Sequence, residues 1–371
     1  MVFSVCSENG IQNERGGAAI DHAVEVTQAL TELPDVEIRS VDTDARVDNR
    51  HVDLAILSEV KGHLVRFLVE AKASGYPRDI QHAIWQLAGM RRLEQSVADV
   101  PLVAAPAISK SSRELLRQHK MAYWDSGGSL YVDLPWALYL IDRPVPAGRP
   151  RILRGPYRGS AAQVLHALLL DTGRSWHVTE LAERAQVSVS TVHQVCTFLE
   201  RELWMEKHGQ GPGAVRVLRQ PGALVDTWAA AHSLAEYSPL RFHRWTPEPG
   251  ELVRIVTDAL ASLQVEHALT LSSGAHLVAP YTTGAGSVSI LVPSSVTATL
   301  EELARRADLR PVEEGETVTL FATRERSPLL FHREVDGFLV ASDVQLYLDL
   351  WAWPQRGKEQ ARHLRAERLG Y

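Results

Sequence analysis

The stretch "FLVEAKAS", residues 67–74, decides how the N-terminal part of the chain is interpreted. An apolar run carries one carboxylate, Glu70, and two positions later one lysine, Lys72. Residues i and i+2 of a strand share a face, so the two side chains are expected to point the same way. Alone, this pattern is typical of a solvated strand face. It also occurs at the metal-binding edge of nuclease-like sites, and the flanking sequence has to distinguish the two.

A second carboxylate precedes this stretch. Asp53 lies in "HVDLAI" (51–56), and a hairpin across "EVKGH" (59–63) would bring it near Glu70. Metal-dependent phosphodiester hydrolysis needs hard oxygen ligands for Mg²⁺ or Mn²⁺, and a nearby cation that positions water and offsets phosphate charge. The sequence therefore predicts a magnesium site at a strand edge, with Asp53 and Glu70 as ligands and Lys72 as the cation.

The pattern from Asp53 to Lys72 resembles the signature of the PD-(D/E)XK nucleases, although its first half lacks the proline. The resemblance covers residues 15–140 and implies a restriction-endonuclease-like α/β sandwich. It also implies two more site residues, the acidic Glu25 on the first helix and Gln81 on the helix after the second strand. Because a fold does not fix a function, cleavage and simple binding both stay open.

Composition limits the class of protein. A length of 371 residues predicts two or three domains, and 45% hydrophobic with 23% charged residues is ordinary for a globular chain. The net charge of −6 excludes a generic polyanion binder, so a nucleic-acid surface has to be a local patch. Two distant cysteines without a CxxC pair argue against structural zinc. With no signal peptide and no membrane-length apolar run, we expect a cytoplasmic protein.

Proline- and glycine-rich stretches predict the domain boundaries. The clearest linker is "DRPVPAGRPRILRGPYRGS" (142–160), and "EYSPLRFHRWTPEPGE" (236–251) is a weaker one. The predicted domains are 1–145, nuclease-like; 150–235, a DNA-binding domain; and 236–371, an α+β domain. The expected fold class is thus α/β multi-domain.

The middle segment predicts three helices, at 159–171, 178–185 and 188–204, followed by a hairpin with a Gly-Pro-Gly turn. Ser188 is placed to cap the third helix. An apolar stripe on that helix is expected to face the core. The positions that then face outward are Val189, Ser190, His193, Gln194 and Thr197.

This segment resembles a winged helix-turn-helix, which implies that its third helix reads DNA. Residues 151–222 hold nine Lys/Arg and six Asp/Glu, a local excess of three positive charges in a negative chain. A helical domain used only for dimerisation is the alternative. The expected contacts to base edges and phosphates are Ser188, Ser190, Thr191, His193, Gln194, Lys207 and Arg216.

The three segments together resemble the AbiEi-type antitoxins of type IV toxin–antitoxin systems. The resemblance rests on "VEAK" (69–72), "YWDSGGSLYVDL" (123–134), the winged helix and "QLYLDLWAWPQRGKEQA" (345–361). In the family's typical members the winged helix is N-terminal, whereas here a nuclease-like domain precedes it. The resemblance implies a regulator that represses its own operon or opposes a partner toxin, and it does not imply catalysis.

Three functions follow from these patterns. The first is a transcriptional regulator of the antitoxin type that binds double-stranded DNA, plausibly as a homodimer on two half-sites. The alternative is a Mg²⁺-dependent endonuclease, in which Asp53 and Glu70 hold the metal, Lys72 orients the water and Gln81 assists. The third is a protein-interaction scaffold. The winged helix and the antitoxin likeness favour the first.

Overall fold

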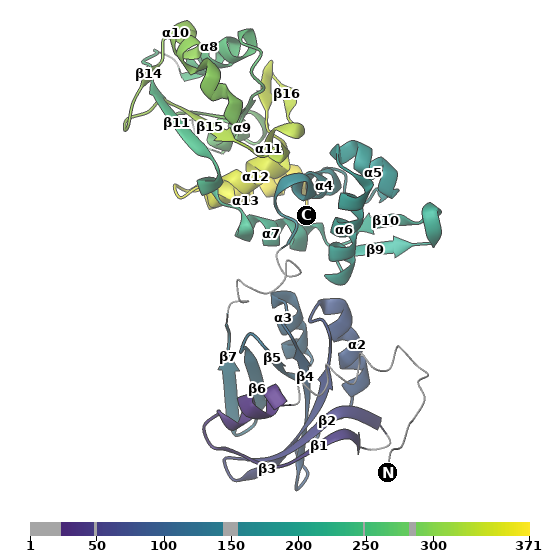
Figure 1. Ribbon diagram of the computed structural model, residues 1–371. Helices are drawn as coiled ribbons and strands as arrows, with labels where there is room; N and C mark the ends of the chain where they lie inside the picture. The colour runs from purple at the N-terminus through teal and green to yellow at the C-terminus, as the bar shows by residue number, and fades with distance from the viewer. Residues whose placement is uncertain (1–23, 48–49, 144–154, 248, 282–286) are drawn as a thin grey trace, which may run out of the picture. The chain divides into compact units, whose positions relative to one another are not determined.

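The computed structural model of the protein describes residues 24–47, 50–143, 155–247, 249–281 and 287–371 (Figure 1). The chain divides into two compact units, the first Met1–Leu153 with Arg201–Leu203 and the second Arg154–Glu200 with Trp204–Tyr371. Each unit contains helices and a sheet with both parallel and antiparallel strand pairs, which confirms the predicted α/β multi-domain class.

The first unit is built on a seven-stranded sheet whose spatial order follows the chain. Its strands are β1 (Val36–Val47), β2 (Arg50–Val60), β3 (His63–Ala71), β4 (Ala98–Ala105), β5 (Ala122–Asp125), β6 (Leu130–Leu134) and β7 (Ala137–Ile141). Strands β1 to β3 are antiparallel to one another, β3, β4 and β5 are parallel, and β5 to β7 are again antiparallel. The parallel strands place their carboxyl ends at one edge of the sheet.

Helices cover both faces of this sheet. Leu30, in the helical residues 24–31, packs in one cluster with Phe67. The opposite face carries Leu68, which packs with Ile80 of α2 (Pro77–Leu87) and Leu116 of α3 (Lys110–Gln118). The unit therefore has three layers, and residues that alternate along β3 belong to different layers.

Strand β1 is an element that the sequence did not predict. The expected helix and the two strands after it are present as residues 24–31, β2 and β3, but "VEIRSVDTDARV" forms a further twelve-residue strand between the helix and β2. It pairs on one side with β2 and lies at the edge of the sheet. Most of its side chains are exposed, so it lacks the apolar alternation by which half-buried strands are recognised.

The second unit begins with helices and a small sheet, and continues into a larger sheet. Its helices are α4 (Gly159–Leu170), α5 (Val178–Ala185), α6 (Val189–Arg201), α7 (Pro221–Ala231), α8 (Pro249–Ser262), α9 (Leu271–Val278), α10 (Leu300–Ala307), α11 (Ser327–Leu330), α12 (Asp343–Ala352) and α13 (Gly357–Leu364). The small sheet has the order β8 (Ser175–Trp176), β10 (Val215–Leu218), β9 (Met205–His208). The three helices and the hairpin predicted for the middle segment are α4, α5, α6 and β9–β10.

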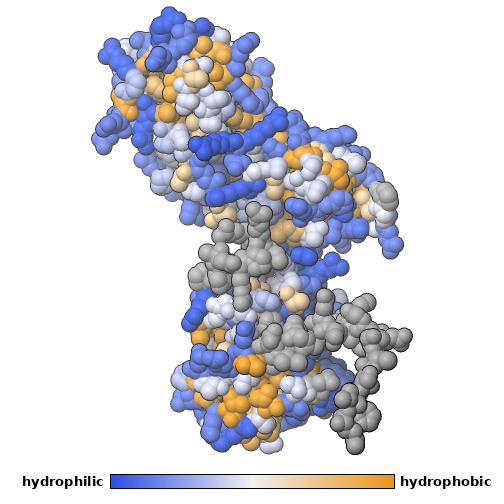
Figure 2. All heavy atoms as spheres, in the orientation of Figure 1, coloured by the Kyte–Doolittle hydropathy of each residue, from blue (hydrophilic) through white to orange (hydrophobic). Residues whose placement is uncertain are grey.

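The larger sheet of this unit has seven strands. Their spatial order is β14 (Arg310–Pro311), β11 (Ser238–His243), β15 (Val318–Thr323), β13 (Val288–Pro293), β12 (Ala268–Leu269), β17 (Phe338–Val340) and β16 (Arg333–Val335). Strand β11 lies inside the stretch read as a boundary, 236–251, and pairs with β15. Figure 2 shows mainly hydrophilic residues on the visible faces. No helix in the described ranges is long and apolar enough to cross a membrane.

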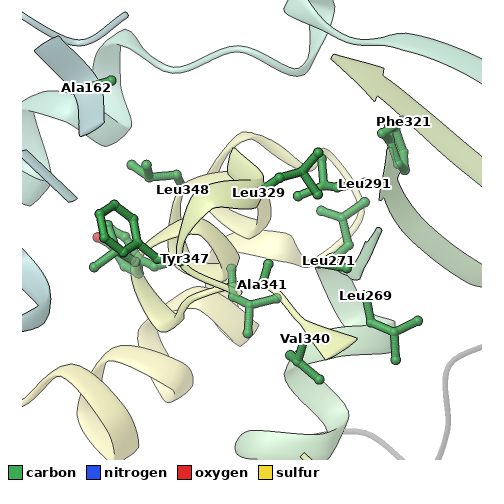
Figure 3. Close-up of a cluster of buried hydrophobic side chains, with 14 of the residues drawn as sticks. Ala162, Leu269, Leu271, Leu291, Phe321, Leu329, Val340, Ala341, Tyr347 and Leu348 are labelled. Atoms are coloured by element: carbon green, nitrogen blue, oxygen red, sulfur yellow. The ribbon is translucent and has the colours of Figure 1, made fainter. Parts of the chain in front are cut away.

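One hydrophobic core joins the helical part of the second unit to its large sheet. Figure 3 shows Ala162 of α4 and Leu348 of α12 in the same buried cluster as Leu291 and Phe321 of the sheet. The segments 150–235 and 236–371 therefore share one core and bury apolar surface against each other.

A buried carboxylate fixes the middle of this unit. Asp349 on α12 is fully buried, and its two oxygens accept hydrogen bonds from His232 (2.9 Å), Tyr237 (3.0 Å), Gln345 (2.7 Å) and Thr270 (2.6 Å). Burial raises the pKa of Tyr237 well above its usual value, so the phenol stays protonated and donates. His232, Tyr237 and Thr270 lie outside α12, so their hydrogen bonds tie this helix to other parts of the unit.

Gly75 lets two loops meet beyond the parallel strands of the first unit. It forms a parallel bridge with Ile108, and its carbonyl accepts from the Ser109 amide at 3.1 Å. A Cβ at this position would lie 2.1 Å from the Ala107 carbonyl oxygen. The absence of a side chain is therefore required for the approach of the two backbones.

Gly75→Ala is expected to lower the free energy of unfolding of the first unit by about 1–3 kcal/mol, because backbone atoms have to move apart to admit the methyl group. Gly213→Ala is the control, since a Cβ there meets nothing within 4 Å. Urea unfolding of the two variants checks this. Equal midpoints for Gly75→Ala and the wild type would show that the loops are not tightly apposed.

Candidate functional site

Asp53 and Glu70 lie opposite each other on neighbouring strands. Leu54 of β2 pairs with Val69 of β3, and the next position outward on each strand is Asp53 and Glu70. The Ala71 amide donates to Asp53 Oδ2 at 2.8 Å, which fixes this carboxylate across the strand pair. Glu70 is two residues from Leu68, so it points to the face that α2 and α3 cover. The predicted proximity of the two carboxylates is thus seen in the structure.

Lys72 is held between the sheet and a helix. Its ammonium group donates to Glu70 Oε1 at 2.7 Å and to Gln86 Oε1, on α2, at 2.5 Å. Its backbone amide donates to the Ala104 carbonyl on β4 at 2.8 Å. Strands β3 and β4 and helix α2 therefore fix this cation beside the two carboxylates.

The electrostatics of the site are unfavourable for Glu70. Only 6% of this residue is exposed, and burial raises the pKa of its carboxyl above the usual value. The hydrogen bond from Lys72 acts in the opposite direction, while the charge of Asp53 raises the pKa further. A half-buried pair of carboxylates with one lysine costs folding free energy, and such arrangements are concentrated at functional sites.

The glutamine that joins this site is Gln86, which the sequence did not single out. Gln81, the expected one, lies half-buried five residues earlier on α2, about 140° around the helix axis. Trp85 beside Gln86 is 68% exposed. Which glutamine of α2 reaches the end of β3 depends on how the helix is rotated about its axis. The buried face of α2, with Ile80 and Leu87, sets that rotation.

Glu25 lies at the same edge of the sheet but beside another strand. Its Oε2 accepts from Ser126 Oγ at 2.8 Å, directly after β5. Strand β5 is two strands away from β3, an offset of about 10 Å. Within the described ranges, no group of three or more His, Cys, Asp or Glu side chains is arranged to hold a metal ion. Glu25 is therefore separate from the pair formed by Asp53 and Glu70.

The donor set fits magnesium better than a structural metal. Two carboxylates face each other, and the charge of Asp53 disfavours ionisation of Glu70, a conflict that a divalent cation between them would remove. Mg²⁺ is commonly bound by one or two protein carboxylates, with waters and substrate phosphates as its other ligands. Asp53 and Glu70 match that requirement, whereas a structural zinc site would need four protein ligands.

A second candidate surface lies on α6 in the second unit. Ser188 caps the helix as predicted, because its Oγ accepts from the Thr191 amide at 3.2 Å. The residues predicted to face outward are all exposed: Val189, Ser190, His193, Gln194 and Thr197. The apolar stripe is buried at Val192, Val195 and Leu199 and half-buried at Phe198. The helix therefore presents a small polar face at its N-terminal half.

The hairpin after α6 holds two residues that were expected to contact DNA, Lys207 and Arg216, and the expectation for Arg216 was wrong. Lys207 is exposed on β9 as expected. Arg216 on β10 is only 7% exposed, and its Nε donates to Glu200 at 3.1 Å, so it supports α6 and is not available to a phosphate. Arg219 is exposed and pairs with Glu206 at 2.7 Å. The sequence did not reveal which face of β10 is buried.

Comparisons with known proteins give little further information. No protein-family model matches the chain, and no curated protein matches it. One solved structure, described as "Structure of EndoMS in apo form", is similar over 32% of this chain and 47% of that chain, with 13% sequence identity and a TM-score of 0.20. The match spans less than half of that chain, and a likeness at this level assigns neither fold nor function.

Glu70→Gln is expected to change how stability depends on pH. The folded-state pKa of Glu70 is raised, so its contribution to stability is complete below the usual value of 4.5 and is lost as the pH rises through the folded-state pKa. The wild type should therefore lose stability relative to Glu70→Gln above pH 4.5, as the pH rises through the raised folded-state pKa. Urea unfolding at several pH values in metal-free buffer measures this. A constant difference between the two proteins would contradict the raised pKa.

Proposed function

We propose that the protein binds double-stranded DNA and cleaves it with a Mg²⁺-dependent centre formed by Asp53, Glu70 and Lys72. The observation that carries the proposal is the convergence of these three side chains on one face of the β2–β3 pair, with Lys72 bonded to Glu70 at 2.7 Å. A solvated strand face would not bury Glu70 or hold its lysine against a helix glutamine.

Each side chain has a defined task in this proposal. Asp53 and Glu70 would hold the ion, and a bound Mg²⁺ supplies Lewis acidity and a more acidic bound water. Lys72, held between Glu70 and Gln86, would orient the attacking water and offset charge on the phosphate. Gln86 would keep the ammonium group at the strand end. The sequence had predicted an assisting glutamine on this helix, at Gln81.

The order of elements supports a restriction-endonuclease-like sandwich for the first unit. A helix at 24–31 is followed by three antiparallel strands, then α2, then β4 parallel to β3. This arrangement puts the two carboxylates on the neighbouring strands β2 and β3, near the carboxyl end of β3, in a sheet with helices on both faces. It agrees with the resemblance drawn from "VEAK".

Plasmid DNA incubated with the protein and Mg²⁺ or Mn²⁺ is expected to be nicked or linearised. Lys72→Ala should reduce the rate about 100-fold or more, because it removes the cation beside the reacting phosphate. Lys61→Ala, an exposed lysine in the β2–β3 turn, should keep the wild-type rate.

Gln86→Ala is expected to lower the rate less than Lys72→Ala, and Gln81→Ala less still, because Gln86 is the one of these two glutamines that accepts a hydrogen bond from Lys72. Metal-independent cleavage, or equal activity of Lys72→Ala and Lys61→Ala, would exclude this centre. If neither metal supports cleavage, the protein would bind DNA without hydrolysing it, as a transcriptional regulator does.

The second candidate function is transcriptional regulation of the antitoxin type, and the exposed face of α6 favours it. The order α4, β8, α5, α6, β9, β10 supports a winged helix-turn-helix, in which α6 would enter the major groove. Gln194 and His193 would reach base edges, and Ser190 and Lys207 would bond phosphates. A homodimer on two half-sites and a partner toxin belong to this proposal. The same α6 surface would deliver the nuclease centre to DNA.

Gln194→Ala and Lys207→Ala are expected to weaken DNA binding in different ways. Gln194→Ala should reduce the preference for the cognate site, whereas Lys207→Ala should weaken binding to all sequences and reduce the salt slope by about 1. Fluorescence anisotropy with the protein's own promoter DNA and with a scrambled duplex measures both, and Lys61→Ala is the charge-matched control. Identical effects on both duplexes would remove Gln194 from the base-reading face.

A further inference from the structure

The first unit contains a second polar site, away from Asp53 and Glu70. A cavity of about 410 Å³ is lined by Ile108, Lys110, Arg113, Glu114, Arg117, Asp142 and Arg143. Four of these side chains are basic and two are acidic, so the lining has an excess of two positive charges. Ligand cavities typically measure about 300–1,000 Å³, which makes this one large enough for a nucleotide.

The cations of α3 form a stripe that folding alone does not favour. Lys110, Arg113 and Arg117 are spaced i, i+3 and i+7, so they project from one side of the helix. Lys110 is the first residue of the helix, where the helix dipole disfavours a positive charge. Asp125 and Asp142 offset part of this positive charge at Arg113. The lining still has two more basic than acidic side chains, which would attract an anion.

Arg113 is held by several hydrogen bonds, and two of its partners, Ile108 and Asp142, also line the cavity. It is buried, and it donates to the buried carboxylate of Asp125 at 2.9 Å and to the Ile108 carbonyl at 3.1 Å. Asp142 also accepts from it. Asp125 lies in the "YWDSGG" stretch, and it accepts the Ser129 amide at 3.1 Å. These contacts fix the guanidinium at the wall of the cavity before any ligand arrives.

Arg117 is held by two neighbouring tyrosines. It donates to the Tyr123 hydroxyl at 2.6 Å, and its guanidinium lies over the ring of Tyr131, 5.5 Å from the centroid. Its Nε is buried and has no hydrogen-bond partner in the part of the chain that the structure describes. Arg117 also lines the cavity, so its charge would attract an anion there.

We propose that this cavity binds the phosphate group of a nucleotide, either free in solution or at the 5′ end of a nucleic-acid strand. Fixed guanidinium groups match the geometry of a phosphate, and the exposed Lys110 and Arg143 add positive charge to the lining. The inference does not depend on the proposed cleavage, because none of the lining residues belongs to the centre formed by Asp53, Glu70 and Lys72.

The test is calorimetric titration of the full chain, in buffer with EDTA so that the cleavage centre takes no part. One arm uses ADP as the free nucleotide. The other arm compares a 5′-phosphorylated trinucleotide with its 5′-hydroxyl form, which is too short to engage α6 as a duplex. Arg143→Gln and Lys110→Gln change exposed residues, and Lys61→Gln is the matched control outside the cavity.

We expect ADP or the 5′-phosphorylated trinucleotide to bind, and each cavity variant to weaken that binding about tenfold or more through loss of a charge-assisted hydrogen bond. Lys61→Gln should bind as the wild type does. Binding of ADP identifies the free nucleotide as the source, and binding of the phosphorylated trinucleotide alone identifies the strand end. No binding tighter than about 1 mM in either arm overturns the proposal. Binding that Arg143→Gln and Lys110→Gln leave unchanged overturns it as well.

Discussion

The antiparallel register of β2 against β3 is the constraint on which the candidate centre depends. Both faces of these strands are covered by helices, so a slip of one residue would move every side chain to the wrong layer. Ile56 and Phe67 pair across the strands and face the helix at 24–31, while Ala55 and Leu68 face α2 and α3. With this register fixed by burial, Asp53 has to lie opposite Glu70.

Contacts outside the β2–β3 pair hold Lys72 beside these carboxylates. The parallel pairing of β3 with β4 fixes the backbone of Lys72 through Ala104, and the bridge between Gly75 and Ile108 continues that pairing past the site. The loop then leads into α2, whose Gln86 reaches Lys72. A buried carboxylate with a raised pKa is thus maintained by the whole sheet. Its cost in stability is understandable if a divalent cation and a phosphate complete the site.

The sequence predicted the helices and strands in which buried apolar residues recur at a regular spacing. Strands β2 and β3, helix α2 and the capped helix α6 were predicted because apolar residues recur at strand or helix spacing. Strand β1 was missed because an exposed edge strand carries few apolar residues. Gln86 and Arg216 depend on which face of a helix or a short strand is buried, and tertiary packing decides that. The single core shared by α4 and α12 joins segments far apart in the chain, which local patterns do not report.

The most direct test of the metal centre is the binding of Mn²⁺ to the whole chain, followed by electron paramagnetic resonance and calorimetry. We expect one strong site per chain, lost or weakened at least tenfold in Asp53→Asn and in Glu70→Gln, since each removes a charged ligand. We also expect Glu25→Gln to bind the ion as the wild type does, because Glu25 lies beside β5. Absence of Mn²⁺ binding, or equal binding by the wild type and Asp53→Asn, would contradict the metal centre.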